Sequence, residues 1–266
     1  MTTAKPGLKF FLSVLFVFLS FFGFGQVSKP SFQFKTIVID AGHGGKDPGA
    51  HGAYSLEKNV TLAIAKKVEV LLNQEMDDVN VIMTRSTDKF IPLNQRSEIA
   101  NENKANLFIS IHCNSSPEGT TSAHKGVLLL VYGFHRQQEQ MEALRENASI
   151  YIEKDYKKTY AEYDQNNPAA FIILNTVMHK YREQSILFGK LLNHEFVEAD
   201  GRKSNGVKEQ GVLVLAHSAM PAVLVETGYI NNPDEEQYLN SETGQNEIAN
   251  SIVEAVKTYR QQINVR

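Results

Sequence analysis

The chain has 266 residues, of which 42% are hydrophobic and 21% are charged, a composition typical of a globular protein with a sizeable core. Its formal net charge of -3 leaves no basic footprint, so nucleic acid is not an expected partner. A single cysteine, Cys113, excludes an internal disulfide framework.

The amino-terminal segment has the pattern of a secretory signal peptide. Lysines precede an apolar block from Phe10 to Phe24, which at about 15 residues is short for a membrane span of roughly 20. We expect a signal peptide over residues 1–25, cleaved after Gly25, and a short linker over 26–35. The alternative is an uncleaved helix that tethers the protein to the membrane. No second hydrophobic segment follows, so no membrane span is expected once the signal is removed.

A strand is predicted over residues 36–41, and it ends in a histidine flanked by glycines, Gly42-His43-Gly44-Gly45. The run of β-branched residues fits an interior strand of a sheet that is covered on both faces. The glycines let the backbone turn sharply and let another group approach the imidazole closely. His43 is therefore either a loop histidine beside a tight turn or a ligand at the carboxyl end of a strand.

An amphipathic helix of about four turns is predicted to open near Glu57, with apolar side chains from Val60 to Leu72 on one face. The carboxylate of Glu57 projects from the first turn of this helix. Two interpretations remain open for it: Glu57 complements the helix dipole, or it points at a cation.

A second histidine, His112, follows another apolar strand. Ligands of open α/β sheets gather outside the carboxyl ends of the strands, so two strand-end histidines indicate a shared site. Strand alternation points Cys113 away from His112 and into the packing. In this part of the chain, strands are predicted over residues 79–83, 107–111 and 127–131, and a helix is predicted over residues 94–103.

The segment from His135 to Phe196 is charged and helical in pattern, with a break at Asn166-Asn167-Pro168. Its first part, residues 137–163, is rich in Glu, Lys and Tyr and is predicted to be an insertion on the surface. Its second part, 171–196, has the spacing of a core-facing helix. Histidines without a strand-end context are expected to be ordinary surface or core residues: His124, His135, His179, His194 and His217.

The last two strands are predicted at 206–215 and 222–225, and a closing helix contains Ile248 to Val256. The final strand ends at Glu226, which puts a carboxylate in the position that histidines hold after earlier strands. Two histidines with one carboxylate, and an open fourth position, form a catalytic zinc set. A further carboxylate is needed to take the proton of a water molecule. On this logic Glu57 or Glu226 can play either part; we favour Glu57 as the ligand because a helix start holds it rigidly.

Four ordered blocks of the chain resemble the signature blocks of the zinc-dependent N-acetylmuramoyl-L-alanine amidases. They are Ile39–Ala50, Glu57–Val60, Ser110–Asn114 and Leu224–Asn232. The resemblance extends from about Thr36 to the C-terminus. It implies one catalytic domain over 36–266 with an α/β fold, a mixed and roughly six-stranded sheet flanked by helices, and a helical insertion.

By this resemblance the zinc ligands are His43, Glu57 and His112, with one Zn²⁺ per chain, and Glu226 is the catalytic glutamate. The implied reaction is hydrolysis of the amide between the lactyl group of N-acetylmuramic acid and L-alanine in peptidoglycan, for wall remodelling and daughter-cell separation. The protein would then be secreted across the cytoplasmic membrane, and periplasmic in a Gram-negative cell. Two other readings stay open: a zinc peptidase of peptidoglycan, and a binding protein that keeps the fold without turnover.

The insertion resembles the regulatory region of the cell-division amidases, in which a helix lies over the zinc cleft and a glutamate caps the metal until a protein activator displaces it. Glu146 or Glu153 would be the capping residue here. The alternative is a surface helix that only widens the substrate groove.

Overall fold

A computed structural model describes residues 33–117, 122–133, 140–161 and 168–264, with the side chains of 168–179 and 264 left out of the description. The expected signal peptide, residues 1–25, and most of the expected linker lie outside the described residues, as does His135. Phe34–Arg266 forms one compact unit. Among the described residues, no helix is both long enough and apolar enough to cross a membrane.

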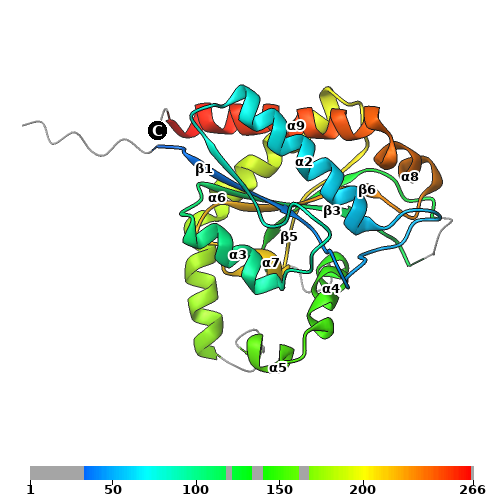
Figure 1. Ribbon diagram of the computed structural model, residues 1–266. Helices are drawn as coiled ribbons and strands as arrows, with labels where there is room; N and C mark the ends of the chain where they lie inside the picture. The colour runs from blue at the N-terminus through cyan, green and yellow to red at the C-terminus, as the bar shows by residue number, and fades with distance from the viewer. Residues whose placement is uncertain (1–32, 118–121, 134–139, 162–167, 265–266) are drawn as a thin grey trace, which may run out of the picture. The chain divides into compact units, whose positions relative to one another are not determined.

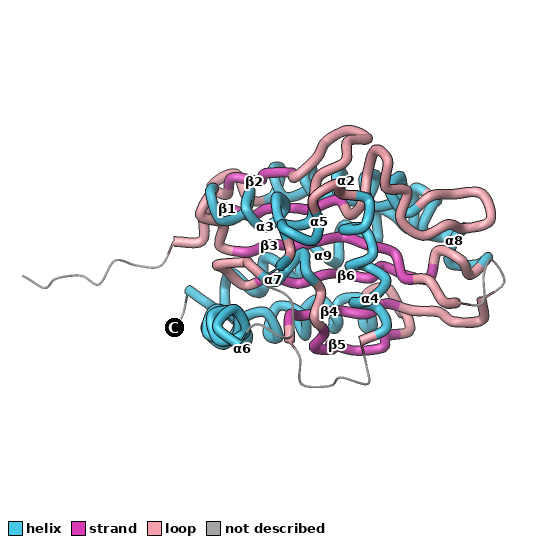
Figure 2. The backbone as a smooth tube through the Cα atoms, turned by 90° about the horizontal axis from the view of Figure 1, so that it is seen from below, coloured by secondary structure: helices cyan, strands magenta, loops and turns pink. Residues whose placement is uncertain are grey.

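Within the described residues, six strands form one sheet in the order β2-β1-β3-β6-β4-β5. Neighbouring strands are parallel except for β4 and β6, which are antiparallel, so the predicted mixed, six-stranded α/β fold is confirmed. Figure 2 shows the strands side by side in this order. The strands are β1 (Thr36–Ala41), β2 (Asn80–Met83), β3 (Leu107–Asn114), β4 (Val127–Tyr132), β5 (Ser204–Gln210) and β6 (Ala222–Tyr229).

Helices cover both faces of the sheet, with α2 and α9 on the upper face in Figure 1 and α3, α4 and α7 on the lower face. The sequence prediction is correct for the helix that opens at Glu57 and for the long core-facing helix, which extends three residues further toward the N-terminus. The helices are α2 (Glu57–Glu75), α3 (Leu93–Glu102), α4 (Met141–Asn147), the 3-10 helix η2 (Ala148–Ile152), α5 (Tyr156–Thr159), α6 (Pro168–Glu198), α7 (Leu213–Ala216), α8 (Pro233–Asn240) and α9 (Glu242–Asn264).

Strand alternation divides the core into a cluster on each face of the sheet. In β3, Ile109 and Ile111 pack in the upper cluster with α2 and α9, whereas Phe108 packs in the lower cluster with α3 and α7. Cys113 is buried in the upper cluster, which confirms its predicted packing role. The even-numbered residues of β3, which include His112, therefore point to the lower face of the sheet, where α4 lies.

One predicted strand is wrong in its second half. Residues 206–215 were expected to form a single strand, but β5 ends at Gln210 and Leu213–Ala216 form the short helix α7. The apolar run from Val212 to Ala216 is buried on the lower face of the sheet. A short, continuous apolar run does not distinguish a buried strand from a buried helical turn, and here tertiary packing selects the turn.

The insertion was expected to lie on the surface, and most of its described residues are exposed or half-buried, but a few of them anchor it to the sheet. Its residues Ala143 and Tyr160 are buried in the lower cluster, and Ile150 packs against the same cluster. Other apolar side chains of the segment face the solvent, since Met141, Leu144 and Tyr151 are 63%, 66% and 68% exposed. The segment therefore packs against the sheet through only a few residues, and α4 lies on the lower face of the sheet (Figure 1).

Candidate metal centre

The backbone of His43 has an unusual conformation just past the end of β1. The strand ladder continues through Gly42, whose N–H donates to the carbonyl of Ile111 at 3.0 Å, and His43 then takes a φ of 59°. Such a left-handed conformation is costly for a residue other than glycine. Two buried arginines hold the turn: Arg96 donates to the carbonyl of His43 at 2.7 Å, and Arg85 donates to that of Gly42 at 2.7 Å. The imidazole is thereby presented at the rim of the sheet.

Arg96 is itself held by a buried carboxylate. Its guanidinium lies 2.7 Å from Asp40, which also accepts hydrogen bonds from the hydroxyls of Thr84 and Ser110 at 2.6 Å each. Burial alone would raise the pKa of Asp40, but Arg96 and the two hydroxyls outweigh it and hold the pKa below its ordinary value. Both arginines therefore have a structural role: Arg96 through its salt bridge to Asp40 and Arg85 through hydrogen bonds to backbone carbonyls, and together they hold the His43 turn.

His112 and Glu226 are brought together by strand register. β3 and β6 pair in parallel with His112 opposite Glu226, and both side chains are buried. The hydroxyl of Thr227 donates to the carbonyl of His112 at 2.8 Å and links the two strand ends. Adjacent residues of parallel strands point to the same face, so a histidine and a carboxylate share the lower side of the sheet.

Glu57 reaches the same place from the first turn of α2. Its two carboxylate oxygens accept hydrogen bonds of 2.8 Å from the backbone N–H groups of Cys113 and Ala50. Gly49 has a φ of +68°, and a Cβ atom there would lie 2.6 Å from both Glu57 and His43. A glycine is required at this position because it lets the loop pass close to both side chains.

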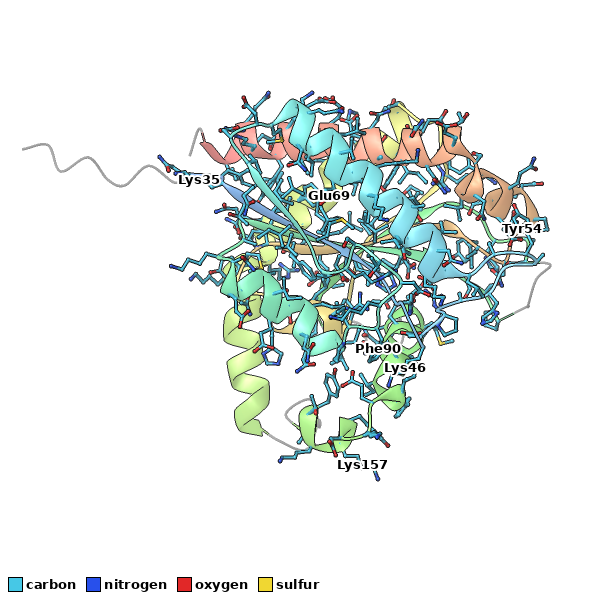
Figure 3. The ribbon with its side chains drawn as sticks, viewed as in Figure 1. Lys35, Lys46, Tyr54, Glu69, Phe90 and Lys157 are labelled. Atoms are coloured by element: carbon cyan, nitrogen blue, oxygen red, sulfur yellow. The ribbon has the colours of Figure 1, made fainter. Side chains whose placement is uncertain are left out.

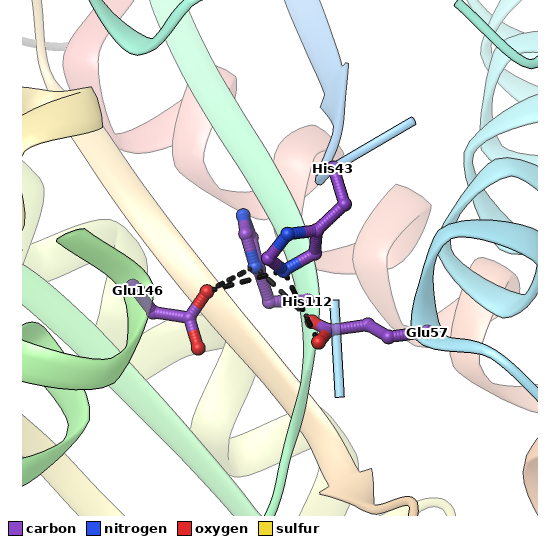
Figure 4. Close-up of side chains that lie close together, drawn as sticks. All are labelled: His43, Glu57, His112 and Glu146. Carbon is purple, nitrogen blue, oxygen red and sulfur yellow. Dashed lines mark ion pairs between the residues drawn. The ribbon is translucent and has the colours of Figure 1, made fainter. Parts of the chain in front are cut away.

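His43, Glu57 and His112 meet Glu146 of α4 in one buried cluster (Figure 4). Their candidate ligand atoms all lie within 4.8 Å of one another. Glu57 lies 3.1 Å from His43 Nε2 and 3.2 Å from His112 Nδ1, and Glu146 lies 3.4 Å and 2.7 Å from the same atoms.

The cluster has the composition of a zinc site. His43 Nε2, His112 Nδ1 and Glu146 Oε2 are buried, converge on one point and have no hydrogen-bond partner among the described residues outside the cluster. Two imidazole nitrogens and carboxylate oxygens are ligands that zinc accepts in a tetrahedral arrangement. The residues therefore fit the metal.

The charges of the cluster also favour a cation. Burial would lower the pKa of His112, but Glu146 and Glu57 raise it to about 9. Burial would raise the pKa of Glu57, but His43 and His112 lower it to about 2. In the absence of a cation, protonated imidazoles balance the carboxylates, so metal binding is expected to release protons.

The carboxylate of Asp47 orients His43 by contacting the ring nitrogen that points away from the cluster. Asp47 Oδ2 lies 2.9 Å from His43 Nδ1, and its other oxygen accepts the backbone N–H of Gly49 at 3.1 Å. This contact leaves Nε2 directed into the cluster. A carboxylate on the outer nitrogen of a metal-binding histidine fixes its tautomer and raises its basicity. Spacing alone did not single out Asp47, although it lies four residues after His43 in the glycine-rich loop.

Arg145, the residue before Glu146, occupies the part of the site next to Glu226. Arg145 Nη2 lies 2.7 Å from Glu226 Oε1, and Arg145 Nη1 donates at 2.7 Å to Asn114 Oδ1 and to the carbonyl of Ser115. Burial raises the pKa of the Glu226 carboxyl to about 8, and the guanidinium opposes this shift without cancelling it. The sequence carried no signal for Arg145 or Asn114 beyond their adjacency to predicted site residues.

Polar contacts hold the insertion over the site. The side chain of Asn147 bonds to the carbonyl of Gly211 at 2.8 Å and to the N–H of Leu213 at 2.7 Å. Lys46 of the glycine-rich loop donates to the carbonyl of Ile152 at 3.0 Å, and its ammonium group lies 4.5 Å from the centroid of the Phe90 ring; both residues are labelled in Figure 3. These contacts tie the middle of the α4–η2 unit to the segment before α7 and its carboxyl end to the glycine-rich loop.

The structure therefore brings most of the predicted site residues together. His43, Glu57, His112 and Glu146 share the cluster, and Glu226 lies next to it through Arg145. Glu153 does not reach the cluster, since its carboxylate accepts a hydrogen bond of 2.8 Å from the hydroxyl of Tyr160.

Comparisons with known proteins agree with this geometry. Residues 37–258 match the family model described as N-acetylmuramoyl-L-alanine amidase. The chain is 33% identical to the probable N-acetylmuramoyl-L-alanine amidase AmiB of Haemophilus influenzae, over 92% of this chain and 56% of that relative. It spans about half the length of this relative and of AmiC from Escherichia coli.

Solved structures of amidases share the fold. The catalytic domain of CwlV from Bacillus (Paenibacillus) polymyxa var. colistinus is 35% identical, with a TM-score of 0.57, over 85% of this chain and 97% of that one. The CwlD amidase from Clostridioides difficile, solved in complex with the GerS lipoprotein, is 25% identical, with a TM-score of 0.62, over 86% of this chain and 99% of that one.

Proposed function

Since the chain belongs to the N-acetylmuramoyl-L-alanine amidase family, we propose that it hydrolyses the amide between the lactyl group of N-acetylmuramic acid and L-alanine in peptidoglycan. The observation that carries the proposal is the convergence of His43, Glu57 and His112 on one point, with the buried carboxylate of Glu226 on the adjacent strand. Three protein ligands and a neighbouring base are the parts of a hydrolytic zinc centre.

In this proposal His43, Glu57 and His112 hold one zinc ion per chain. A zinc ion at such a site supplies a Lewis acid that polarises a carbonyl and lowers the pKa of a water molecule toward about 7. Asp47 keeps Nε2 of His43 directed at the cluster, and the N–H groups of Cys113 and Ala50 orient Glu57.

Glu226 is the proposed general base and acid. It accepts a proton from the attacking water and returns it to the leaving nitrogen, so that the carbon–nitrogen bond breaks with a neutral amine as the leaving group. Burial raises the pKa of Glu226 in the closed arrangement, and a raised pKa favours the return of the proton to the leaving nitrogen.

Digestion of purified muropeptides, with and without a chelator, tests this function. An amidase releases the whole stem peptide with a free L-alanine amine, whereas a peptidoglycan peptidase releases shorter fragments. Glu226→Gln should lower release strongly while zinc remains bound, which separates an enzyme from a binding protein with the same fold. Activity that survives removal of all zinc would contradict the zinc mechanism.

We further propose that the enzyme is autoinhibited. Glu146 lies 2.7 Å from His112 and occupies the fourth ligand position that substrate would need, and α4 is tied down over the cluster. A protein activator that displaces the insertion would open the site. The solved complex of the related CwlD with a lipoprotein supports the idea that an amidase of this fold can bind a protein partner.

The biological setting is also a proposal. A secreted, periplasmic enzyme that splits the walls of daughter cells accords with the apolar block before Gly25 and with a substrate outside the cytoplasmic membrane. Cell fractionation and amino-terminal sequencing test it: a mature chain that begins near Gln26 is expected, and an intact chain found only in the membrane fraction would support a tether.

A further inference from the structure

We propose that the oxygen atoms now bound by Arg145 form the binding site for the leaving amine of the substrate, and that Asn114 is the side chain that recognises it. This inference rests on the proposed amide hydrolysis, because it assigns a role in that reaction. It concerns the part of the site beside the metal cluster, where Arg145 contacts Asn114 of β3 and Glu226 of β6.

The corner that Arg145 fills is lined by acceptors. Its guanidinium donates to Asn114 Oδ1, to the carbonyl of Ser115 and to Glu226 Oε1, each at 2.7 Å. These oxygens come from the adjacent ends of β3 and β6, so they belong to the rigid sheet, whereas Arg145 belongs to α4. Three acceptors, one of them a carboxylate, select a group with several N–H donors and positive charge.

Asn114 has the bonding pattern of a ligand-binding residue. It is buried, its Oδ1 accepts from Arg145, and its Nδ2 has no hydrogen-bond partner among the described residues. The buried Asn232 is different, since its Oδ1 accepts from the first turn of α8 and its Nδ2 donates to the carbonyl of Ser122. The acceptor Oδ1 loses its donor when Arg145 leaves, and a buried acceptor without a donor costs free energy, so Asn114 then needs another donor. The Nδ2 group is itself a donor and is left to bind an acceptor.

Arg145 and Glu146 together imitate the products of amide hydrolysis. Water adds its oxygen to the carbonyl carbon, the carbon–nitrogen bond breaks, and both water protons end on the nitrogen, one of them carried by Glu226. The products are a carboxylate and an ammonium group. In the structure Glu146 Oε2 lies between the two imidazoles, while its Oε1 lies 2.9 Å from Nε of Arg145, whose Nη2 binds Glu226.

The charges therefore lie in the same order in the pair Glu146–Arg145 and in the pair of products. In both pairs a carboxylate lies at the two histidines and a cation lies beside Glu226. If Arg145 only fastened α4 to the sheet, its acceptors would have no preference for a free amine once α4 had moved. Binding of an amine to the opened site distinguishes these roles.

The experiment uses the full chain with Arg145→Ala and Glu146→Ala, called the open variant, after zinc has been removed with a chelator. Calorimetry then compares two synthetic peptides that begin with L-alanine, one with a free α-amino group and one with that group acetylated. We expect the free amine to bind roughly tenfold more tightly, the ratio that a hydrogen bond to a charged group gives.

Asn114→Leu in the open variant should remove this preference, and Asn114→Asp should keep it because the acceptor oxygen remains. The matched control is Asn101→Leu, whose amide bonds to the backbone of His217 and Ala219 away from the site. It should leave the preference unchanged. Melting temperatures of all variants exclude a general loss of structure.

Equal binding of the two peptides to the open variant would overturn the inference even if Asn114→Leu failed to fold. A preference that survives Asn114→Leu would overturn the role of Asn114. Turnover of muropeptides by the zinc-loaded open variant is measured separately. Turnover without an amine preference removes only the leaving-group assignment, and an amine preference without turnover counts against the proposed amidase.

Discussion

The capping role of Glu146 makes the sharpest prediction about regulation. Glu146→Gln keeps the volume of the side chain and removes the charge that lies 2.7 Å from His112 and 3.4 Å from His43. At full zinc occupancy the carboxylate of Glu146 would face the cation instead of protonated imidazoles, and removing one partner of a buried ion pair costs about 3–5 kcal/mol. This loss falls on the closed arrangement alone, so the ratio of open to closed molecules should rise about a hundredfold or more.

The assay is release of soluble fragments from dye-labelled peptidoglycan, without any activator and at full zinc occupancy. The rate of basal release should be much higher in Glu146→Gln than in the wild type, and its upper limit is the rate of a fully open population. The control is Glu153→Gln, because Glu153 bonds to Tyr160 and lies outside the metal cluster. Basal release that stays at the wild-type level in Glu146→Gln, or that rises equally in both variants, would refute the capping role.

Three further predictions concern the centre and its support. Glu226→Gln should lower the rate of hydrolysis by roughly 10²–10⁴-fold while zinc content, measured by atomic absorption, stays at one per chain; lost zinc would instead make Glu226 a ligand. Asp47→Asn should weaken zinc binding by about 10–100-fold in a competition with a chromophoric chelator, and unchanged affinity would remove its orienting role. The lowered pKa of Asp40 means that its contribution to stability is complete above the ordinary value of 3.8 and is lost as pH falls through the folded value. Urea unfolding should therefore show a smaller loss of stability between pH 5 and roughly pH 2 in Asp40→Asn than in the wild type, and equal losses would contradict the buried pair with Arg96.

A deletion of the insertion is a poor substitute for these point variants. Ala143 and Tyr160 are part of the lower core cluster, so removal of 137–163 would expose apolar surface beside α3 and α7. Lower activity after such a deletion would report loss of structure rather than loss of regulation. Single substitutions at the cluster leave this packing in place.

Much of the site could be predicted because its parts are local in sequence. His43 and His112 each follow an apolar strand, and the carboxyl ends of parallel strands meet at one edge of a sheet, so their convergence follows from pattern and topology. Glu57 was identifiable as a carboxylate at a helix start. Its partners, the N–H groups of Cys113 and Ala50, appear only when the loop and β3 come together.

Other features depended on how elements pack. The run from Val212 to Ala216 is apolar throughout, and only its position on the lower face of the sheet decides that part of it is helical. The insertion reads as a polar surface segment because its few apolar residues are widely spaced. Those residues are nevertheless enough to hold it against the sheet.

The sequence by itself determined the strand-end histidines and the carboxylates of Glu57 and Glu226, since each depends on the pattern of a short stretch. The choice between Glu146 and Glu153 arose only from the resemblance of the insertion to the regulatory region of the cell-division amidases. Only the tertiary structure decided that Glu146 and not Glu153 faces the histidines, and that Arg145 holds Asn114 and Glu226. Arg145 meets those two residues across separations of 31 and 81 positions in the chain. Contacts of that range arise from the docking of α4 on the sheet, and no local pattern of residues encodes the docking.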